Sequence, residues 1–459
     1  MSKASLAKLP RQAGQPFIGN AIAFRDDALG FVSEAALGGP LVEIALPFRA
    51  KAYLVSDPDT IHQILATRAD HFRKGRLYQR LRPVLGEGLV TAEHDVWRKH
   101  RAIAQPLFHP SKLKRMSTAM VQETQQQIER WTSGETIDFS KEMSDLTLRI
   151  MTKLMFGSDF VDSSTIYDSV RDINEGLFHW IWSPLPKPEM WPTSATRRLH
   201  NANRELRAAV QRIIANRRKQ ASWGEDLLSQ LILAKDEDSR SALSPAALED
   251  EVATFFLAGH ETTSSWLTWA AYAIAQNPSV EHELANECLG DNTSEKSDTQ
   301  PKLAYTRMVL DETLRLYPPV WTIFREAAQS VDIMGHKFPE GSLFMISPWV
   351  MHRHPLHWKN PTLFDPENFS RDRRAAHNPG LYFPFGGGPR LCIGINMATI
   401  EATMILSTLV RNFSWRLVDP WTISPKPAVT LMPSGPVRMR LLDRDEKRLD
   451  TGDWAKAVG

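Results

Sequence analysis

The sequence predicts a mainly α-helical protein with a smaller β component, an α+β fold. Apolar residues recur at helical spacing over most of the chain from residue 57 to residue 275, and short strand-like runs lie near both ends. Neither a repeat nor a Gly/Ser-rich linker divides the chain. We therefore expect a single domain over residues 1–459, with residues 15–60 and 320–350 contributing to the β region and a charged tail at residues 443–459.

The first predicted elements are a β-hairpin and a helix. Apolar runs at residues 41–46 and 52–56 are separated by Pro-Phe-Arg-Ala-Lys, which favours two strands joined by a turn. Asp57-Pro58 is a start signal for the first helix. The early apolar stretch at residues 28–47 is interrupted by two glutamates, and we interpret it as a poor membrane anchor.

The remaining predicted elements follow in chain order. We expect a loop rich in tryptophan and proline at 180–192, helical periodicity at 195–235, a long helix from Pro245, a polar surface loop at 291–300, strands at 331–334 and 343–347, and a last helix after Gly394. Further strand-like pieces precede the charged tail.

The composition is that of an ordinary globular protein. The chain has 55 basic and 53 acidic side chains, a net charge of +2 and 42% hydrophobic residues. These values argue against wholesale disorder, a collagenous fibre and a protein of many membrane spans. Two cysteines in 459 residues cannot form a disulfide framework, and no apolar run behind the N-terminus is long enough for a signal peptide. We therefore expect a cytoplasmic protein.

Residues 251–275 predict a long buried helix with a polar centre. The segment reads EVATFFLAGHETTSSWLTWAAYAIA and would be roughly 37 Å long as a helix. Its ends are apolar almost all round, which favours burial in the core. Polar groups in a buried helix cost free energy unless they are satisfied, so the central Gly-His-Glu-Thr-Thr-Ser-Ser marks a candidate site.

Three other interpretations of this helix compete. A membrane span would place Glu261 near mid-depth, which is costly. A zinc-protease motif would need a second histidine where Ser264 stands. A structural kink stays open, because threonine and serine can bond back to the preceding turn, and a kink is compatible with a function.

The loop at residues 383–394, FPFGGGPRLCIG, combines three glycines with a cysteine. It lacks the Lys-Ser/Thr ending of a phosphate-binding loop. Cys392 stands just before a helix predicted at 396–411, where the helix dipole and free N–H groups stabilise a thiolate. This arrangement suits a nucleophile or a metal ligand, whereas Cys288 lies on an ordinary polar helix and fits a small buried hydrophobe.

Three histidines, His352, His354 and His357, lie close together in the sequence. They could suggest a metal site, but no Cys, Asp or Glu ligand is adjacent and Pro355 breaks the spacing. We expect a surface or capping role for them.

A basic region spans residues 73–115. It holds eleven basic side chains, opposed only by Glu87, Glu93 and Asp95. Charge alone favours a solvated face, and the alternatives are a surface for an acidic protein partner, an anionic cofactor or nucleic acid.

Glu312 and Arg315 lie three residues apart on one face of a predicted helix, in an apolar context that favours a buried ion pair. The chain thus carries, in sequence order, Ala-Gly-His-Glu-Thr-Thr at 258–263, Glu-x-x-Arg at 312–315 and Phe-x-x-Gly-x-Arg-x-Cys-x-Gly at 385–394. In these motifs and their order it resembles the cytochrome P-450 family, over nearly the whole chain from the hairpin to the last helix.

The resemblance implies a fold with a long central helix over a haem (heme b, iron protoporphyrin IX), a β-sheet region near the N-terminus and short C-terminal strands. Cys392 would be the proximal thiolate ligand of the haem iron, whose electron donation favours O–O cleavage. Thr262 would order water and deliver protons to bound dioxygen, with Glu261 beside it in the proton path. Ala258 and Gly259 would let the haem and dioxygen approach the helix closely.

The resemblance assigns five further residues to the haem. Members of the family bond the haem propionates through a Trp-x-x-x-Arg pattern and through other arginines, since guanidinium–carboxylate bonding is favourable. The matching residues here, together with the phenylalanine of the cysteine loop, are Trp97, Arg101, Arg325, Phe385 and Arg390.

In the same family, the Glu-x-x-Arg pair supports the cysteine loop, a role that falls here on Glu312 and Arg315. The third partner of this pair usually comes from a Pro-Glu-Arg-Phe-like segment. This sequence has Asn368 in place of the arginine, an amide that can still hydrogen-bond.

The family's usual reaction inserts one oxygen atom from dioxygen into an unactivated bond, as in hydroxylation, and uses two electrons. The chain leaves no room for a fused flavin reductase, so the resemblance implies a separate ferredoxin or flavodoxin with its reductase, and NAD(P)H as the indirect electron source. Such partners are acidic, and the docking face would be formed by Arg98, Lys99, Lys112, Lys114 and Arg115. Without an N-terminal anchor the chain is similar to soluble bacterial members, and we expect a monomer that binds no nucleic acid.

The substrate pocket is expected to be apolar, with Phe255, Phe256, Ala258, residues 320–323 and residues 178–182 as its lining. Such a pocket favours a large hydrophobic substrate, for example a terpenoid, a fatty acid or a carotenoid-like molecule. The alternatives are a haem-retaining binding protein, a zinc or nucleic-acid-binding protein, and a peroxide-using or isomerising member of the same fold. Such a member would normally lack the adjacent Glu-Thr pair.

Overall fold

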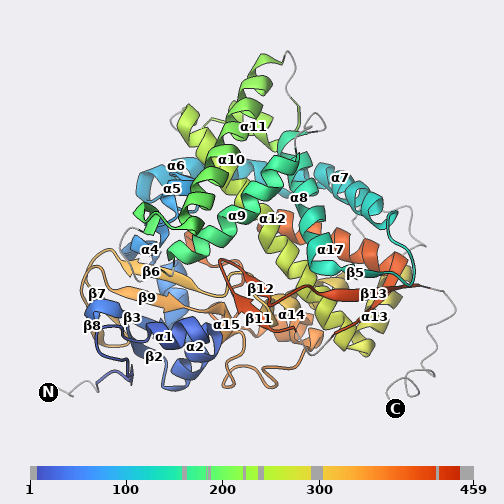
Figure 1. Ribbon diagram of the computed structural model, residues 1–459. Coiled ribbons are helices and arrows are strands. Elements are labelled where there is room, and N and C mark those ends of the chain that lie inside the picture. Colours follow the sequence, from blue (N-terminus) through green and yellow to red (C-terminus); the bar gives the residue numbers. More distant parts are fainter. Residues whose placement is uncertain are drawn as a thin grey trace.

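The computed structural model describes residues 8–157, 163–181, 183, 188–220, 224–235, 242–290, 303–419 and 423–444. Helices form most of this part of the chain, and a smaller β region lies to one side, in the lower left of Figure 1. The predicted α+β class is therefore confirmed.

Six strands form the main sheet, in the order β1-β2-β3-β9-β6-β4. In that order their bounds are Arg11–Gln12, Leu41–Ala45, Lys51–Val55, Leu343–Ile346, Ile323–Ala327 and Phe72–Arg73. β2 and β3 are the antiparallel hairpin that the sequence predicts, and β9 runs parallel to β3. Strands far apart in the sequence share this sheet because Val55, Phe344 and Ile346 bury their side chains in one core.

Two helices, α1 (Ala21–Asp26) and α2 (Ala28–Leu37), precede the hairpin. The prediction that the first helix starts at Asp57 is therefore wrong, although Asp57 does cap α3 (Pro58–His62). α2 has its own cap in Asp27. The sequence interpretation considered the apolar residues of α2 only as a membrane anchor, whereas in the structure they pack against the sheet.

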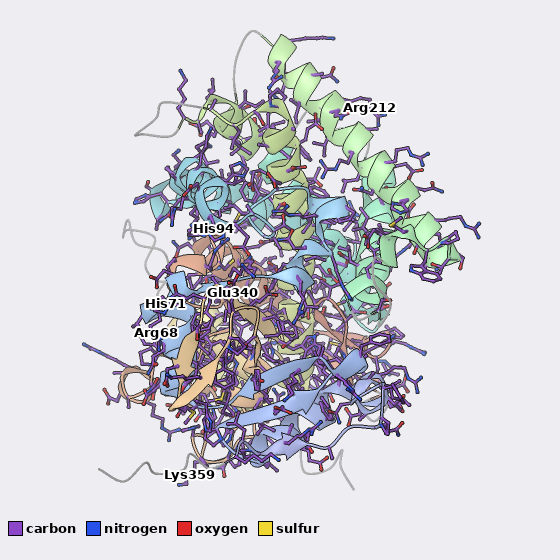
Figure 2. All side chains as sticks on the ribbon, turned by 90° about the vertical axis from the view of Figure 1, so that its left-hand side faces the viewer. Arg68, His71, His94, Arg212, Glu340 and Lys359 are labelled. Carbon is purple, nitrogen blue, oxygen red and sulfur yellow. The ribbon has the colours of Figure 1, made fainter. Side chains whose placement is uncertain are left out.

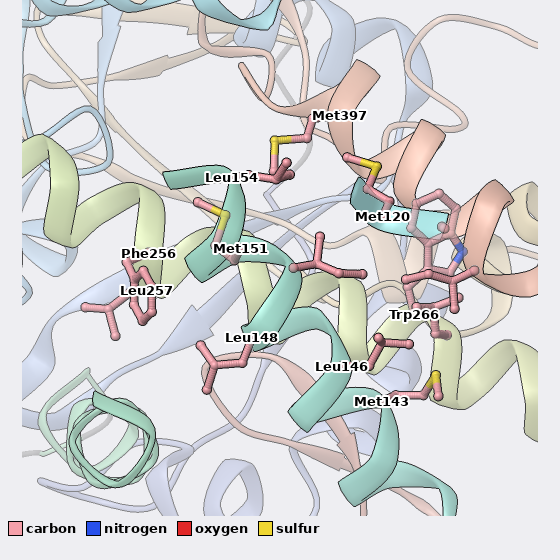
Figure 3. Packing of buried hydrophobic residues seen from close by; sticks show 14 of the residues in the cluster. Met120, Met143, Leu146, Leu148, Met151, Leu154, Phe256, Leu257, Trp266 and Met397 are labelled. Carbon is pink, nitrogen blue, oxygen red and sulfur yellow. The ribbon is translucent and has the colours of Figure 1, made fainter. Parts of the chain in front are cut away.

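The long helix α12 (Pro245–Gln276) crosses the molecule and starts where the sequence predicts, with Ser244 as its cap. Its most extensive helix contacts are with α8 (Phe139–Phe156), α10 (Ser194–Lys219), α14 (Ala304–Leu316) and α17 (Ile395–Asn412). Figure 3 shows apolar side chains of the core around α8 and α12, among them Met151 of α8 and Trp266 of α12. Because α12 is covered on most sides, its apolar residues are buried nearly all round.

The helical region predicted at 195–235 consists of two helices. α10 ends at Lys219, where Gln220 takes an extended conformation, and α11 (Leu227–Leu233) begins with Asp226 as its cap. α9 (Ser163–Ile181) reaches into the stretch predicted as a loop, and a short 3-10 turn at Pro188–Met190 follows. The polar loop predicted at 291–300 and most of the charged tail lie outside the described residues.

The other helices are short or lie at the periphery. They are α4 (Arg76–Gln79), α5 (Arg82–Leu85), α6 (His94–Ala104), α7 (Pro110–Ile128), α13 (Pro278–Gly290), α15 (Pro348–Met351) and α16 (Arg371–Ala375). Across the described ranges, no helix combines the length and the apolar character needed to cross a membrane.

Three small sheets complete the fold. They comprise β10 (Phe413–Leu417), β13 (Arg438–Asp443) and β5 (Thr136–Asp138); β11 (Pro425–Pro427) and β12 (Leu431–Pro433); and β7 (Val331–Ile333) and β8 (His336–Phe338). The turn between β11 and β12 lies against α12, because the Leu431 carbonyl accepts the Ser265 hydroxyl at 2.7 Å and the Trp269 indole N–H at 3.0 Å. This contact brings Thr430 next to the polar centre of α12.

Candidate active site

The cysteine loop owes its shape to glycines that no other residue replaces easily. Gly386 and Gly388 have φ angles of 76° and 61°, in the left-handed region. A Cβ atom on Gly388 would lie 2.1 Å from the Leu65 carbonyl oxygen, so the loop approaches the backbone of another segment too closely for a side chain. The Cys392 N–H donates to the Phe385 carbonyl at 3.0 Å, and the loop then leads into α17.

Cys392 is accessible, yet burial is the main cause that raises the pKa of its thiol. Its accessible face therefore opens onto an interior space. The Gly394 N–H and the charges of Arg101 and Lys74 act in the opposite direction and lower the pKa. The sequence-based expectation of a stabilised thiolate is thus met only in part, and a bound metal would complete the deprotonation.

Glu312 and Arg315 form a fully buried ion pair that supports the segments around the loop. Arg315 donates to both carboxylate oxygens at 2.7 Å and also to the carbonyls of His352, Pro361 and Leu363. Every nitrogen of the guanidinium thus donates hydrogen bonds within one buried network. These bonds offset the cost of burying the charge.

Asn368 takes the place of the family's arginine in this network. Its side-chain amide donates to the Glu312 carboxylate at 3.2 Å, next to the Asp365 N–H at 2.8 Å. An uncharged donor therefore completes the hydrogen bonding of the carboxylate, without a second positive charge.

The surface or capping role that the sequence suggests for the histidine cluster holds for the exposed His357 but not for His352. His352 is fully buried, and its Nε2 accepts the Phe383 N–H at 3.0 Å. His354 is also buried. His352 thus links the network around Arg315 to the start of the cysteine loop, which begins at Phe383.

The threonines and Glu261 in the polar centre of α12 are bonded within the helix and by the β11–β12 turn, whereas His260 Nδ1 and Ser264 Oγ have no hydrogen-bond partner among the described residues. The Thr262 hydroxyl donates to the Ala258 carbonyl at 2.9 Å, and the Thr263 hydroxyl to the Gly259 carbonyl at 3.2 Å. The Glu261 carboxyl accepts the Thr430 hydroxyl at 2.9 Å, and burial raises the pKa of Glu261 to about 7. An acid with this pKa can both release and take up a proton at neutral pH.

Ala258 and Gly259 differ in what they face. Ala258 is exposed to the interior and lines a cavity. A Cβ atom on Gly259 would instead lie 3.0 Å from the Met151 sulfur of α8. The missing side chain at 259 therefore serves helix packing, and a haem contact of its backbone stays a prediction.

Four cationic side chains gather near the cysteine loop: Lys74, Arg101, Arg325 and Arg390. Burial, followed by the charges of Arg325 and Arg390, holds the pKa of Lys74 well below its usual range. Glu93 is the carboxylate that offsets these charges, and it pairs with Arg390 at 2.8 Å. A cluster with this excess of positive charge is suited to a ligand that carries carboxylates.

The predicted propionate partners have definite positions in this cluster. Arg101 donates to the Leu391 carbonyl at 2.9 Å, directly before Cys392. The Arg390 guanidinium lies over the Trp97 ring, 4.1 Å from its centroid. Arg325 is buried on β6 and donates to the Phe324 carbonyl at 2.9 Å.

A largely apolar cavity of about 240 Å³ lies beside α12. As predicted, Ala258 and residues 320–322 line it. Phe255 and Phe256 do not: Phe255 packs on Phe108, and Phe256 stacks on Phe156 of α8. Phe256 lies on the face of α12 opposite the cavity and Phe255 at the edge of the lining face. The sequence could not show this, because a helix buried all round gives no sign of which face borders a cavity.

The remaining predicted lining comes from residues 178–182. Trp180 is buried and donates to the Thr196 hydroxyl at 3.3 Å, so it supports α10. The side chains at 178, 179, 181 and 182 lie outside the described residues.

Sequence reasoning missed three residues of this site. Thr430 bonds Glu261, Glu93 bonds Arg390, and Lys74 joins the cationic cluster. Lys74 and Glu93 were counted only as part of a charged region. Their roles depend on contacts with residues 250 or more positions away, for which a single sequence holds no local signal.

The donor set fits a haem. A thiol suits an iron ligand, and four cations around one carboxylate suit two propionates. The apolar wall around Ala258 suits the porphyrin face, and Phe385 lies in the cysteine loop, where its carbonyl accepts the Cys392 N–H. The residues present therefore agree with the cofactor that the sequence motifs imply.

Comparison with known proteins gives the same answer. Residues 10–440 match the family described as cytochrome P450. The chain is 32% identical to cyclooctatin synthase of Streptomyces melanosporofaciens over 433 residues, covering 93% of this chain and 94% of that protein. It is 30% identical to pentalenene oxygenase of Streptomyces avermitilis, covering 93% and 95%. The crystal structure of the cytochrome P450DA heme domain is similar with a TM-score of 0.85 at 25% identity, covering 96% of this chain and 98% of that one.

These similarities span the cysteine loop, the long central helix and the buried Glu-Arg pair alike. The chain therefore belongs to the cytochrome P450 family and is a haem-dependent monooxygenase.

Proposed function

We propose that this monooxygenase oxidises a terpenoid. The observation that carries the proposal is the cavity beside α12, in which leucine and valine side chains surround the Glu261–Thr262 pair. Three similar proteins are named for cyclooctatin, cyclooctat-9-en-7-ol and pentalenene. These names support a cyclic terpenoid over the fatty acid and the carotenoid-like molecule that the sequence also allows.

Haem, when bound, supplies the centre at which dioxygen is activated. Cys392 would hold its iron, and the cationic cluster would bind its propionates. The Arg101–Leu391 bond ties the cluster to the cysteine loop, so both groups are positioned as one unit. The Trp97 ring stacks on the Arg390 guanidinium and keeps it in place.

The protons for the reaction would pass through Glu261 and Thr262. Glu261 receives the Thr430 hydroxyl and holds a proton near neutral pH, because its pKa is about 7. Thr262 is one residue further along α12 and lies at the cavity wall. The Glu261 carboxyl would pass its proton through water to the Thr262 hydroxyl oxygen while the hydroxyl's own proton leaves toward the cavity, and Glu261 would then take up a proton again from solvent.

Electrons would come from NAD(P)H through a separate reductase with a ferredoxin or a flavodoxin. α6 supports this proposal, because it carries both Arg101, which bonds the cysteine loop, and the surface cations Arg98 and Lys99. A partner docked on α6 would stand close to Cys392. The side chains of Lys114 and Arg115 lie outside the described residues, and Lys112 lies in the first turn of α7. Monomeric state and cytoplasmic location stay predictions.

The ligand assignment is tested by the spectrum of the reduced, carbon-monoxide-bound protein. The wild type should give a thiolate-type Soret band, and Cys392→Ala should lose it. Cys288→Ala is the matched control and should keep the band, because Cys288 is buried beside Thr306. A wild type without this band, or a band that survives Cys392→Ala, would refute the assignment.

The reaction is tested by product formation from cyclic terpenes with a ferredoxin, its reductase and NADPH. We expect products that contain one oxygen atom from labelled dioxygen. Terpene binding without product, across ferredoxin and flavodoxin partners, would instead favour a haem-retaining binding protein.

A further inference from the structure

The cavity beside α12 contains polar groups that the proposed reaction does not use. Glu261, Thr262 and Thr430 belong to the proton path. Asn174 of α9, Thr254 of α12 and Thr322 also line the cavity, among side chains that are mainly apolar, and we consider the first two because they lie on helices on different walls. Burial of a polar side chain costs free energy unless it forms a hydrogen bond, so we looked for the group that each of these two side chains would bond.

Thr254 differs from the other threonines of its helix. Thr262, Thr263 and Thr268 each donate a hydroxyl hydrogen bond to the carbonyl four residues earlier. Thr254 is 2% exposed, and its hydroxyl has no hydrogen-bond partner within the described residues. The Thr254 hydroxyl could bond to the carbonyl four residues earlier but does not. It is therefore available to form a hydrogen bond with another group.

The Thr254 hydroxyl packs against Gly88, which accommodates it because glycine has no side chain. A Cβ atom on Gly88 would lie 2.1 Å from the Thr254 Oγ1 atom. Threonine has two accessible χ1 positions in a helix, so a change of rotamer, about 120° in χ1, can turn the hydroxyl from Gly88 toward a molecule in the cavity.

Asn174 supplies a second group on another wall of the cavity. It is half-buried, and its amide makes no hydrogen bond in the part of the chain that the structure describes. Leu177, one turn further along α9, lines the same cavity and is buried. An amide offers both donors and an acceptor, so it can bind an alcohol or a carbonyl oxygen.

We propose that Asn174 and Thr254 bind an oxygen function of the substrate and thereby determine specificity. The substrate is then an oxygenated terpenoid, an alcohol or a ketone, and not a bare hydrocarbon. This inference rests on the proposed function and narrows it. The reaction that supplies the substrate is a hydroxylation of the skeleton or a cyclisation that ends with the capture of water.

The spacing along α12 gives the substrate an orientation. Thr254 and Thr262 are eight residues apart in the sequence, which is roughly 12 Å along a helix. An oxygen held at Thr254 places the opposite end of the molecule near Thr262. A purely apolar wall would accept several orientations, and a hydrogen bond at one end selects one of them.

The test compares matched pairs of molecules that differ in one hydroxyl group. The probes are cedrene with cedrol and hexadecane with hexadecanol. Each is titrated into the haem-loaded protein, and the dissociation constant is read from the spin-state shift of the Soret band. Wild type, Asn174→Leu and Thr254→Val are measured, with Leu177→Met as the control in the same wall.

We expect wild type to bind the alcohol of at least one pair roughly three- to tenfold more tightly than its hydrocarbon, as one neutral hydrogen bond contributes. Asn174→Leu and Thr254→Val should each reduce this preference while hydrocarbon binding persists. Leu177→Met should change the dissociation constants of both members of a pair by the same factor. The reduced carbon-monoxide spectrum shows which variants fold, and Asn174→Met replaces Asn174→Leu if the latter fails.

The outcomes separate the inference from the proposed function. Equal affinities in wild type, or a preference that survives both substitutions, overturn the inference. A preference for hexadecanol that both substitutions reduce, without any binding of cedrene or cedrol, supports the binding of an oxygen function by Asn174 and Thr254 and counts against a terpenoid substrate. Absence of binding by both alcohols refutes both.

Discussion

Two buried glutamates show how burial by itself adjusts the chemistry of a residue. Burial raises the pKa of Glu261 to about 7 and that of Glu401, in α17, to about 8. Glu261 borders the cavity and accepts a hydroxyl from Thr430, whereas Glu401 lies 2% exposed in the core. The same physical cause therefore serves proton transfer in one place and only costs stability at high pH in the other.

Glu261→Gln should slow product formation by roughly 10²-fold or more, because a positioned acid–base group contributes about that factor. The protonated carboxyl is the form that donates. The wild-type rate should therefore fall as the pH rises through about 7, the pKa of Glu261. The glutamine variant should lose this inflection, and a pH profile of product formation by wild type and variant measures it. An unchanged inflection in the variant would contradict the role of Glu261.

Glu401→Gln should change how stability depends on pH. The folded-state pKa of about 8 lies above the ordinary value of 4.5, so the contribution of Glu401 is fully present below about pH 4.5. It is lost as the pH rises toward 8, by a few kcal/mol at about 1.4 kcal/mol per pKa unit. The glutamine side chain does not titrate, so the stability of the variant relative to wild type should increase over this pH range.

Urea unfolding of the haem-loaded protein at about pH 5 and about pH 8 measures this difference. Glu129→Gln is the control, because Glu129 is exposed at the end of α7. The difference in stability between this variant and wild type should be the same at both pH values. A gap between wild type and Glu401→Gln that stays constant with pH would count against a buried, protonated Glu401.

At the scale of elements, the cysteine loop depends on its close approach to another backbone segment. Gly386 and Gly388 both have positive φ, but their surroundings differ. A Cβ on Gly388 would meet the Leu65 carbonyl at 2.1 Å, whereas one on Gly386 would meet only the Arg390 carbonyl at 3.9 Å. Conformation alone therefore restricts position 386, and conformation together with packing restricts position 388.

Gly388→Ala should cost about 3 kcal/mol or more, because a strained φ is added to a clash with rigid backbone. Gly386→Ala should cost about 1–2 kcal/mol, the strain alone. Urea unfolding and the ratio of haem to protein after purification measure both effects. Equal losses in the two variants would show that the approach to Leu65 is unimportant.

At the scale of the whole molecule, one face combines surface charge with proximity to the cysteine. α6 begins at the exposed His94, labelled in Figure 2, and carries Arg98 and Lys99 outward while Arg101 bonds the carbonyl before Cys392. Arg98 is paired with the exposed Asp95, so its charge is partly compensated. Among the side chains that the structure describes on this face, Lys99 and Lys112 therefore contribute most of the attraction for an acidic partner.

Lys99→Glu and Lys112→Glu should weaken binding of an acidic ferredoxin several-fold at low ionic strength. The effect should shrink as salt is added, because exposed charges are screened. Titration of the ferredoxin at two salt concentrations measures it. Lys359→Glu makes the same charge change far from α6, as Figure 2 shows, and should leave the affinity unaltered. Equal weakening by all three variants would point to net charge alone.

The sequence predicted the parts of this molecule that depend on neighbouring residues. The start of α12 at Pro245, the hairpin and the helix after Gly394 follow from local capping, turn and periodicity signals. α1 and α2 were missed because their apolar residues were interpreted only as a membrane anchor. The break after Lys219 was missed because helical periodicity continues beyond it.

The sequence by itself determined the chemical class. Cys392 in its glycine loop, the Glu261–Thr262 pair and the Glu312–Arg315 pair act at fixed short spacings, so their order identifies the family. Only the tertiary structure decided which face of α12 borders the cavity, and which partners meet there. Thr430 with Glu261 and Glu93 with Arg390 join segments far apart in the chain. Such contacts arise from the packing of whole elements, and no local pattern of residues encodes them.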